Sequence, residues 1–240
     1  MKRFLALLVI LWSSASFSFA QAEHAGPTIS GKVTILDYKG KPKSDHSGVV
    51  VFLDNLPASS PSAAQPAAPR MRQINKSFDP KVLPIAVGTT VEFPNDDNVF
   101  HNVFSLSKTK PFDLGIYAQN SSKSVVFDQP GLVKVYCNIH PQMIGYILVL
   151  ANPYFTTTDE DGHFILENAP VGLATIRTWY PSSKNGPEKH IRISHSDIED
   201  LDLTVKESTD AKEDIQLQIR EETVPLRHKN KWGEDYQEKY

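Results

Sequence analysis

Cysteine is almost absent from this sequence. The chain of 240 residues holds a single cysteine, Cys137, and only three methionines. One thiol cannot form a disulfide within the chain, so no disulfide framework can hold the fold together. The fold must therefore be stabilised by its hydrophobic core, and the role of the lone thiol needs its own explanation.

Long hydrophobic runs and an excess of basic charge are also missing. The longest apolar run is FLALLVILW, residues 4–12, whereas a membrane-spanning helix needs about 20 such residues. The 25 basic residues are outnumbered by 28 acidic ones, which gives a net charge of −3. Nucleic-acid binding requires a basic surface, so the composition gives no support for that function.

The N-terminus has the pattern of a secretory signal peptide. Lys2 and Arg3 precede the short apolar run, and small residues up to Ala22 offer cleavage positions. A membrane anchor is the alternative, which the shortness of the run disfavours. We expect residues 1–22 to be removed, leaving a mature chain without a transmembrane segment. In an exported chain a lone thiol is buried and inert, paired with another chain, or chemically used.

Long helical periodicity is lacking between residues 71 and 152, where short β-rich runs bounded by glycine, proline or asparagine take its place. The pattern predicts an all-β protein with sandwich-like layers. The two strands expected before the Pro/Ala/Ser-rich stretch are too few to form a domain alone, so we expect them to complete the sheet made by the strands after residue 153. The predicted segments are a signal peptide at 1–22, first strands at 28–56, a linker at 57–70, an inserted domain at 71–152, the remaining strands at 153–220 and a charged tail at 221–240.

The residues around Cys137 carry the clearest chemical signal. His140 and Met143 follow it at steps of three, and Pro141 disfavours a helix, so the donors should share a loop between two strands. His101 offers a second imidazole, 36 residues before the cysteine. Thiolate and imidazole are good ligands for late first-row metals, and two histidines, one cysteine and a weak axial methionine form the blue-copper set.

Three alternatives to this copper site remain open at this point. Zinc is a competitor, although structural zinc sites prefer four cysteine or histidine ligands. A nucleophilic thiol next to an imidazole is another, although no clear oxyanion-type motif accompanies it. The third is a buried cysteine that binds nothing, with Met143 packing in the core.

Two stretches resemble the cupredoxins. VGTTVEFPNDDNVFHNV is similar to the cupredoxin stretch that carries the first histidine ligand, and YCNIHPQM is similar to the ligand loop, with the spacing of amicyanin. In plastocyanin-like members the last gap is longer. The resemblance covers residues of about 80 to 150 and implies a Greek-key β-sandwich. Many members have proline just before the second histidine, where this chain has Ile139.

The resemblance also implies a function for individual residues. His101, Cys137, His140 and Met143 would be ligands to one copper ion that cycles between Cu(I) and Cu(II), and Asn102 would form a hydrogen bond near the thiolate loop. Such a protein carries single electrons and is not an enzyme. Its partner would be a redox protein, a dehydrogenase or a cytochrome, bound through a small transient interface.

The flanking segments have a resemblance of their own. ISGKVTILDYKGKP, VVVFLD and TTTDEDGHFILENAPVGLATIRTWYP are similar to a carboxypeptidase-regulatory-like β-sandwich of the transthyretin type. The whole arrangement resembles exported bacterial proteins of the methylamine utilization group, which implies a periplasmic location. A copper-binding, sensing or structural module without electron transfer, bound to a partner through the flanking sandwich, is the alternative function.

Overall fold

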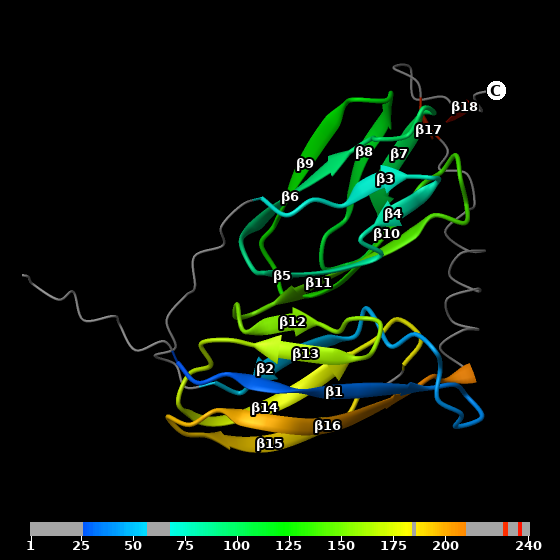
Figure 1. Cartoon of the computed structure of the whole chain (residues 1–240). Coiled ribbons are helices and arrows are strands. Elements are labelled where there is room, and N and C mark those ends of the chain that lie inside the picture. Colours follow the sequence, from blue (N-terminus) through cyan, green and yellow to red (C-terminus); the bar gives the residue numbers. More distant parts are fainter. Residues whose placement is uncertain (1–25, 57–67, 184–185, 210–227, 230–234, 237–240) are drawn as a thin grey trace, which may run out of the picture.

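The computed structural model describes residues 26–56, 68–183, 186–209, 228–229 and 235–236. The predicted signal peptide, most of the 57–70 linker and most of the 221–240 tail lie outside the described residues. Within the described part the protein is all-β, as predicted, and it has no helix of the length and apolarity that crossing a membrane would require. The strands form two bodies, one above the other in Figure 1.

The first body, here called the flanking sandwich, is built from strands at both ends of the described chain. Its sheets have the orders β13-β1-β16 and β12-β2-β14-β15. Both sheets contribute to one core, which includes Ile35, Leu53, Phe164 and Ile176. Its strands are β1 (Ile29–Leu36), β2 (Val50–Asp54), β12 (Phe155–Thr157), β13 (His163–Leu166), β14 (Gly172–Trp179), β15 (Glu188–Ile193) and β16 (Ile198–Lys206).

The strands before residue 57 pair with strands after residue 153. β1 lies between β13, antiparallel, and β16, parallel, and β2 lies between β12 and β14, both antiparallel. In the turn before β13, Gly162 has a φ of +86°, and a Cβ there would lie 2.2 Å from the carbonyl oxygen of Val33. Only glycine fits this turn without strain.

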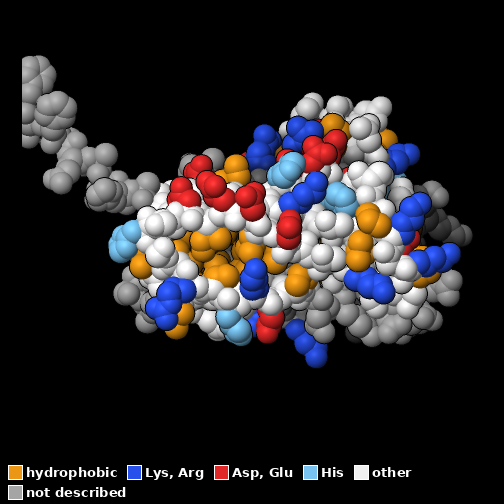
Figure 2. Space-filling view, turned by 60° about the horizontal axis from the view of Figure 1, so that its bottom comes forward, with side chains coloured by type: hydrophobic (Ala, Val, Ile, Leu, Met, Phe, Trp, Pro, Cys, Tyr) orange, Lys and Arg blue, Asp and Glu red, His pale blue; other side chains and the backbone are white. Residues whose placement is uncertain are grey.

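Two of the edge strands of the flanking sandwich are charged. β15 and β16 each lie at one edge of their sheet and expose acidic and basic side chains, among them Lys189, Arg192, Glu199 and Asp202. Figure 2 shows the resulting surface, a band of hydrophobic side chains with a row of acidic ones along one side and basic ones around it. Charges at sheet edges oppose pairing with another chain.

The second body, here called the central sandwich, is formed by residues 70–150. Its five-stranded sheet, of order β5-β11-β10-β7-β8, faces the β6-β9 and β3-β4 pairs. The core between them includes Phe93, Val103, Phe127 and Ile147. The strands are β3 (Arg72–Ile74), β4 (Ser77–Asp79), β5 (Val82–Ala86), β6 (Thr89–Pro94), β7 (His101–Ser105), β8 (Phe112–Tyr117), β9 (Ser122–Phe127), β10 (Gly131–Tyr136) and β11 (Ile144–Leu150), while β17 (His228–Lys229) and β18 (Asp235–Tyr236) form a separate pair.

A third hydrophobic cluster joins the two sandwiches. Tyr146 and Leu148 of β11 are buried together with Val50 of β2, and the ring of Tyr146 lies 5.6 Å from that of Trp179 on β14. The neighbouring Ile147 faces the central core instead. β11 is apolar on both faces because it is buried on both.

Candidate metal centre

His101 is the first residue of β7 and is completely buried. It follows the Asn/Asp-rich turn at residues 95–99 and pairs with Tyr117 across the β7–β8 ladder. The ladder to β8 holds the backbone of His101 on one side, whereas β7 pairs with β10 only farther along the strand, where Phe104 lies opposite Tyr136. The imidazole is therefore carried by a buried strand end that one neighbouring strand fixes.

Cys137 begins the loop between β10 and β11. The strand ends at Tyr136, the loop spans residues 137–143, and β11 starts at Ile144. Within the loop the amide of Met143 donates a hydrogen bond of 2.9 Å to the carbonyl of His140, which closes a turn around Pro141. This is the strand–loop–strand arrangement that the sequence predicted.

The structure brings three of the predicted donors to one point. Cys137 Sγ lies 3.7 Å from His101 Nδ1 and 3.8 Å from His140 Nδ1, and the two nitrogens are 3.2 Å apart. A point equidistant from these atoms is about 2.1 Å from each, close to the bonds of about 2.0–2.3 Å between a late first-row ion and imidazole or thiolate. The donor set and its spacing fit a trigonal metal site.

Protonation also favours metal binding at His140. Burial lowers the pKa of this imidazole below its ordinary value, and the neighbouring His101 and Lys76 act in the same direction. A neutral imidazole keeps a lone pair on one ring nitrogen, which is the form that binds a metal. Cys137 is buried, so the site is closed to bulk solvent except at His140, whose side chain is half-buried.

Met143 lies in the same hydrophobic core cluster as Cys137 and is 1% exposed. Its position at the end of the ligand loop, directly before β11, is the one that the sequence assigned to an axial ligand. Burial alone is equally expected of a core methionine, so the axial role of Met143 stays a prediction.

Asp97 is a contributor that the sequence reasoning missed. Its carboxylate oxygen lies 2.8 Å from His101 Nε2, on the side of the ring away from the donor triangle. Burial would raise the pKa of this carboxyl group, but hydrogen bonds from the amides of Lys76 and Asn75 and from His101 outweigh it, and the pKa lies below the ordinary value. The sequence contained one signal for this role, an acidic residue four positions before the first histidine, but it lies in the Asn/Asp-rich segment that we interpreted only as a turn.

Asn102 follows His101 on β7 and is buried, as expected of a residue next to the candidate metal centre. Its amide nitrogen donates a hydrogen bond of 2.7 Å to Asp113 on β8, whereas the sequence analysis expected a bond near the thiolate loop. Its carbonyl oxygen has no hydrogen-bond partner among the described residues. Asn102 therefore ties β7 to β8 next to His101.

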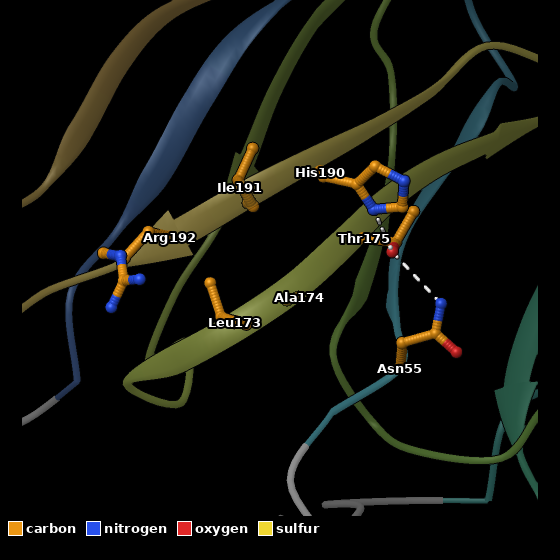
Figure 3. A pocket seen from close by; sticks show the side chains of 7 residues that line it. All are labelled: Asn55, Leu173, Ala174, Thr175, His190, Ile191 and Arg192. Carbon is orange, nitrogen blue, oxygen red and sulfur yellow. Dashed lines mark hydrogen bonds between the residues drawn. The ribbon is translucent and has the colours of Figure 1, made fainter.

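A separate hollow lies on the flanking sandwich, over β14 and β15. Figure 3 shows Asn55 donating to the hydroxyl of Thr175, which also contacts Nδ1 of His190, at 3.1 and 3.0 Å. These three polar side chains satisfy one another, with Thr175 buried beneath the exposed Asn55 and His190. The hollow contains none of the metal donors.

No family model and no curated protein matches the chain. Among solved structures, a purple cupredoxin from Nitrosopumilus maritimus is 29% identical, with a TM-score of 0.32, over 34% of this chain and 99% of that one. The copper-containing nitrite reductase from Thermus scotoductus SA-01 is 32% identical, with a TM-score of 0.34, over 39% of this chain and 24% of its own. An amicyanin variant is 21% identical, with a TM-score of 0.34, over 44% of this chain and all of its own. The case for a metal rests on the donor geometry itself.

Proposed function

We propose that this chain is an exported mononuclear copper protein that carries single electrons. The observation that carries the proposal is the triangle formed by His101 Nδ1, His140 Nδ1 and Cys137 Sγ, with sides of 3.2 to 3.8 Å. One soft thiolate and two imidazoles in a trigonal arrangement form the ligand set of copper electron-transfer sites. Met143, at the end of the same loop, would complete the set as a weak fourth ligand.

The chain contributes a rigid and largely dry site. His101 is held by β7, Cys137 by the end of β10, and the loop between β10 and β11 is closed by the hydrogen bond from Met143 to His140. Copper bound there would take up and release one electron as it changes between Cu(I) and Cu(II). A scaffold that keeps its donors fixed lowers the rearrangement that accompanies each change of charge.

Electrons would enter and leave beside His140. Its side chain is half-buried, while Phe100 and Ile139, next to the two histidines in sequence, are 59% and 39% exposed. Exposed apolar side chains next to both histidines in sequence suit a small, short-lived contact with a redox protein such as a dehydrogenase or a cytochrome. The chain needs no substrate pocket for this role, which is that of a carrier rather than an enzyme. The flanking sandwich would be a regulatory-like module of a periplasmic protein.

The test is to load the mature protein with one equivalent of Cu(II). An intense absorption band at about 600 nm, from the thiolate–copper bond of this ligand type, together with reversible one-electron voltammetry, is the expected result. Cys137→Ser should remove the band. His190 is an exposed histidine of the flanking sandwich, so His190→Ala should leave the band unchanged. Stoichiometric copper binding without the band, or a band without reversible electron transfer, would contradict the proposal.

A further inference from the structure

Asp97 is fixed from three directions although it lies in a turn. One carboxylate oxygen accepts the amide of Asn75 at 2.7 Å, and the other accepts the amide of Lys76 at 2.8 Å. The second oxygen also contacts His101 Nε2 at 2.8 Å. Asp97 is 9% exposed, so these bonds are largely shielded from water, which strengthens them.

The two amides come from the turn between β3 and β4. Asn75 and Lys76 both have a φ of 52°, the left-handed pair of a tight two-residue hairpin turn. In this conformation their successive N–H groups point to the same place, and such a pair of amides binds an anionic oxygen well. A hairpin more than 20 residues earlier in the sequence is thereby joined to the first histidine.

The turn that carries Asp97 is itself fixed. The amide of Asp97 donates to the side-chain oxygen of Asn95 at 3.0 Å, and the side-chain nitrogen of Asn95 donates to the carbonyls of Val99 and Tyr117. Tyr117 is the residue that pairs with His101 across the β7–β8 ladder. The carboxylate and the imidazole are therefore placed by one hydrogen-bonded unit.

This arrangement determines where the proton of His101 lies. An ionised carboxylate only accepts hydrogen bonds, so Nε2 of the ring must be the N–H that faces Asp97. In the neutral ring the lone pair is then on Nδ1, the atom 3.2 Å from His140 Nδ1 and 3.7 Å from Cys137 Sγ. The opposite tautomer would place two acceptors against each other at Asp97 and a proton in the donor triangle.

We infer that Asp97 is the positioning residue of the metal centre, which holds His101 as the Nε2–H tautomer before any metal arrives and strengthens Nδ1 as a donor. The strengthening of Nδ1 as a donor rests on the proposed function, since a carboxylate partner makes a metal-bound imidazole a better electron donor. A stronger donor stabilises Cu(II) more than Cu(I), so Asp97 lowers the reduction potential of the centre.

The first arm of the test needs no metal. Nitrogen-15 NMR of the histidine rings of the metal-free protein should show His101 in the Nε2–H form, and Asp97→Ala should give a mixture of tautomers. Asp96→Asn is the matched control, because it removes the same charge one position away, from a residue that is paired with Arg72 and not with the histidine. Asp97→Asn, which retains one acceptor oxygen, is the second variant should the alanine protein not fold.

The second arm measures copper. Loss of the Asp97 carboxylate should weaken Cu(II) binding by about 10- to 100-fold and Cu(I) binding by less, so that the reduction potential rises, while Asp96→Asn should change neither affinity more than about twofold. An Nδ1–H tautomer in the wild type, or variants at Asp97 that keep the tautomer and both affinities, would overturn the inference. If the wild type binds no copper, the proposed function fails, and the NMR arm alone decides the role of Asp97.

Discussion

Leu148→Ala is expected to weaken both sandwiches at once, because this side chain belongs to the cluster that joins them. Leu148 is 8% exposed, and truncating a buried leucine to alanine lowers the free energy of unfolding by about 2–5 kcal/mol. The residue lies between two bodies rather than at the centre of one, so water can partly refill the space. We expect a loss in the lower half of this range, about 2–3 kcal/mol.

Urea unfolding of the mature protein measures this loss. A slope of about 2.5 kcal/mol per molar urea is reasonable for a chain of this size, so the midpoint should fall by about 1 M. Trp179 is a natural probe, because it lies in the joining cluster against Tyr146. In a Trp232→Phe background it is the one tryptophan that remains after the predicted signal peptide, which contains Trp12, is removed.

The control for Leu148→Ala is Leu173→Ala. Leu173 is 61% exposed on β14, and its truncation should change the free energy of unfolding by less than about 0.5 kcal/mol. In the wild type the tryptophan fluorescence and the far-ultraviolet circular dichroism should change together, as one cooperative transition. A midpoint shift below about 0.3 M for Leu148→Ala, or a fluorescence change that precedes the loss of β-structure in the wild type, would refute the reasoning.

Three further predictions concern other parts of the structure. Met143→Leu conserves volume, so it should lower the free energy of unfolding by less than about 1.5 kcal/mol. Voltammetry of the copper-loaded variant should show a higher reduction potential, because three donors suit Cu(I) better than four. An unchanged potential would argue against axial ligation by Met143. Gly162→Ala and Gly40→Ala both force alanine into left-handed backbone, which costs about 1–2 kcal/mol of stability each. Of these two glycines only Gly162 lies close to another backbone group, so thermal denaturation should show that Gly162→Ala destabilises the protein by about 1–3 kcal/mol more than Gly40→Ala. Equal losses of stability would contradict this packing. Burial would lower the pKa of Lys43, but its hydrogen bond to Glu207 raises this pKa above the ordinary value of 10.5. The stabilisation by this ion pair is therefore complete below the ordinary pKa and is lost as the pH rises through the folded-state pKa. Urea unfolding at increasing pH should show a smaller alkaline loss of stability for Lys43→Met than for the wild type, and parallel stability curves would exclude the ion pair as the cause.

The part of the candidate site that lies on the loop between β10 and β11 could be predicted because it is local. Cys137, His140 and Met143 lie on one short loop, and Pro141 shows that the loop is not helical. His101 lies 36 residues earlier and was only a candidate imidazole from the residues alone; its place beside the loop was what the resemblance of its stretch to the cupredoxins implied. Asp97 was missed because its role depends on the turn between β3 and β4, whose amides reach it only in the folded chain.

The sequence led us to expect that the strands before residue 57 join those after residue 153, but it could not supply the individual pairings or their direction. Alternating apolar residues predict that β1 and β16 are strands, but nothing in either run specifies that they lie side by side and parallel. The sequence also did not predict the cluster that joins the two sandwiches, although the run IGYILVL has no polar side chain on either face of the strand except the hydroxyl of its tyrosine. Such a run predicts burial on both faces without saying which second body covers the outer one.

The pairing of β2 with β12 has a consequence for the order in which the chain folds. Phe52 lies opposite Phe155, and closing a flexible loop of about 100 residues between them costs on the order of 4 kcal/mol in chain entropy. Because the chain is made from its N-terminus, β1 and β2 have no strand partners until the segment from β12 to β16 follows. A central sandwich that has already folded replaces the flexible loop with a rigid body. We therefore expect assembly of the flanking sandwich to wait for its insert, so that a defect around Cys137 would slow the maturation of strands that never touch it.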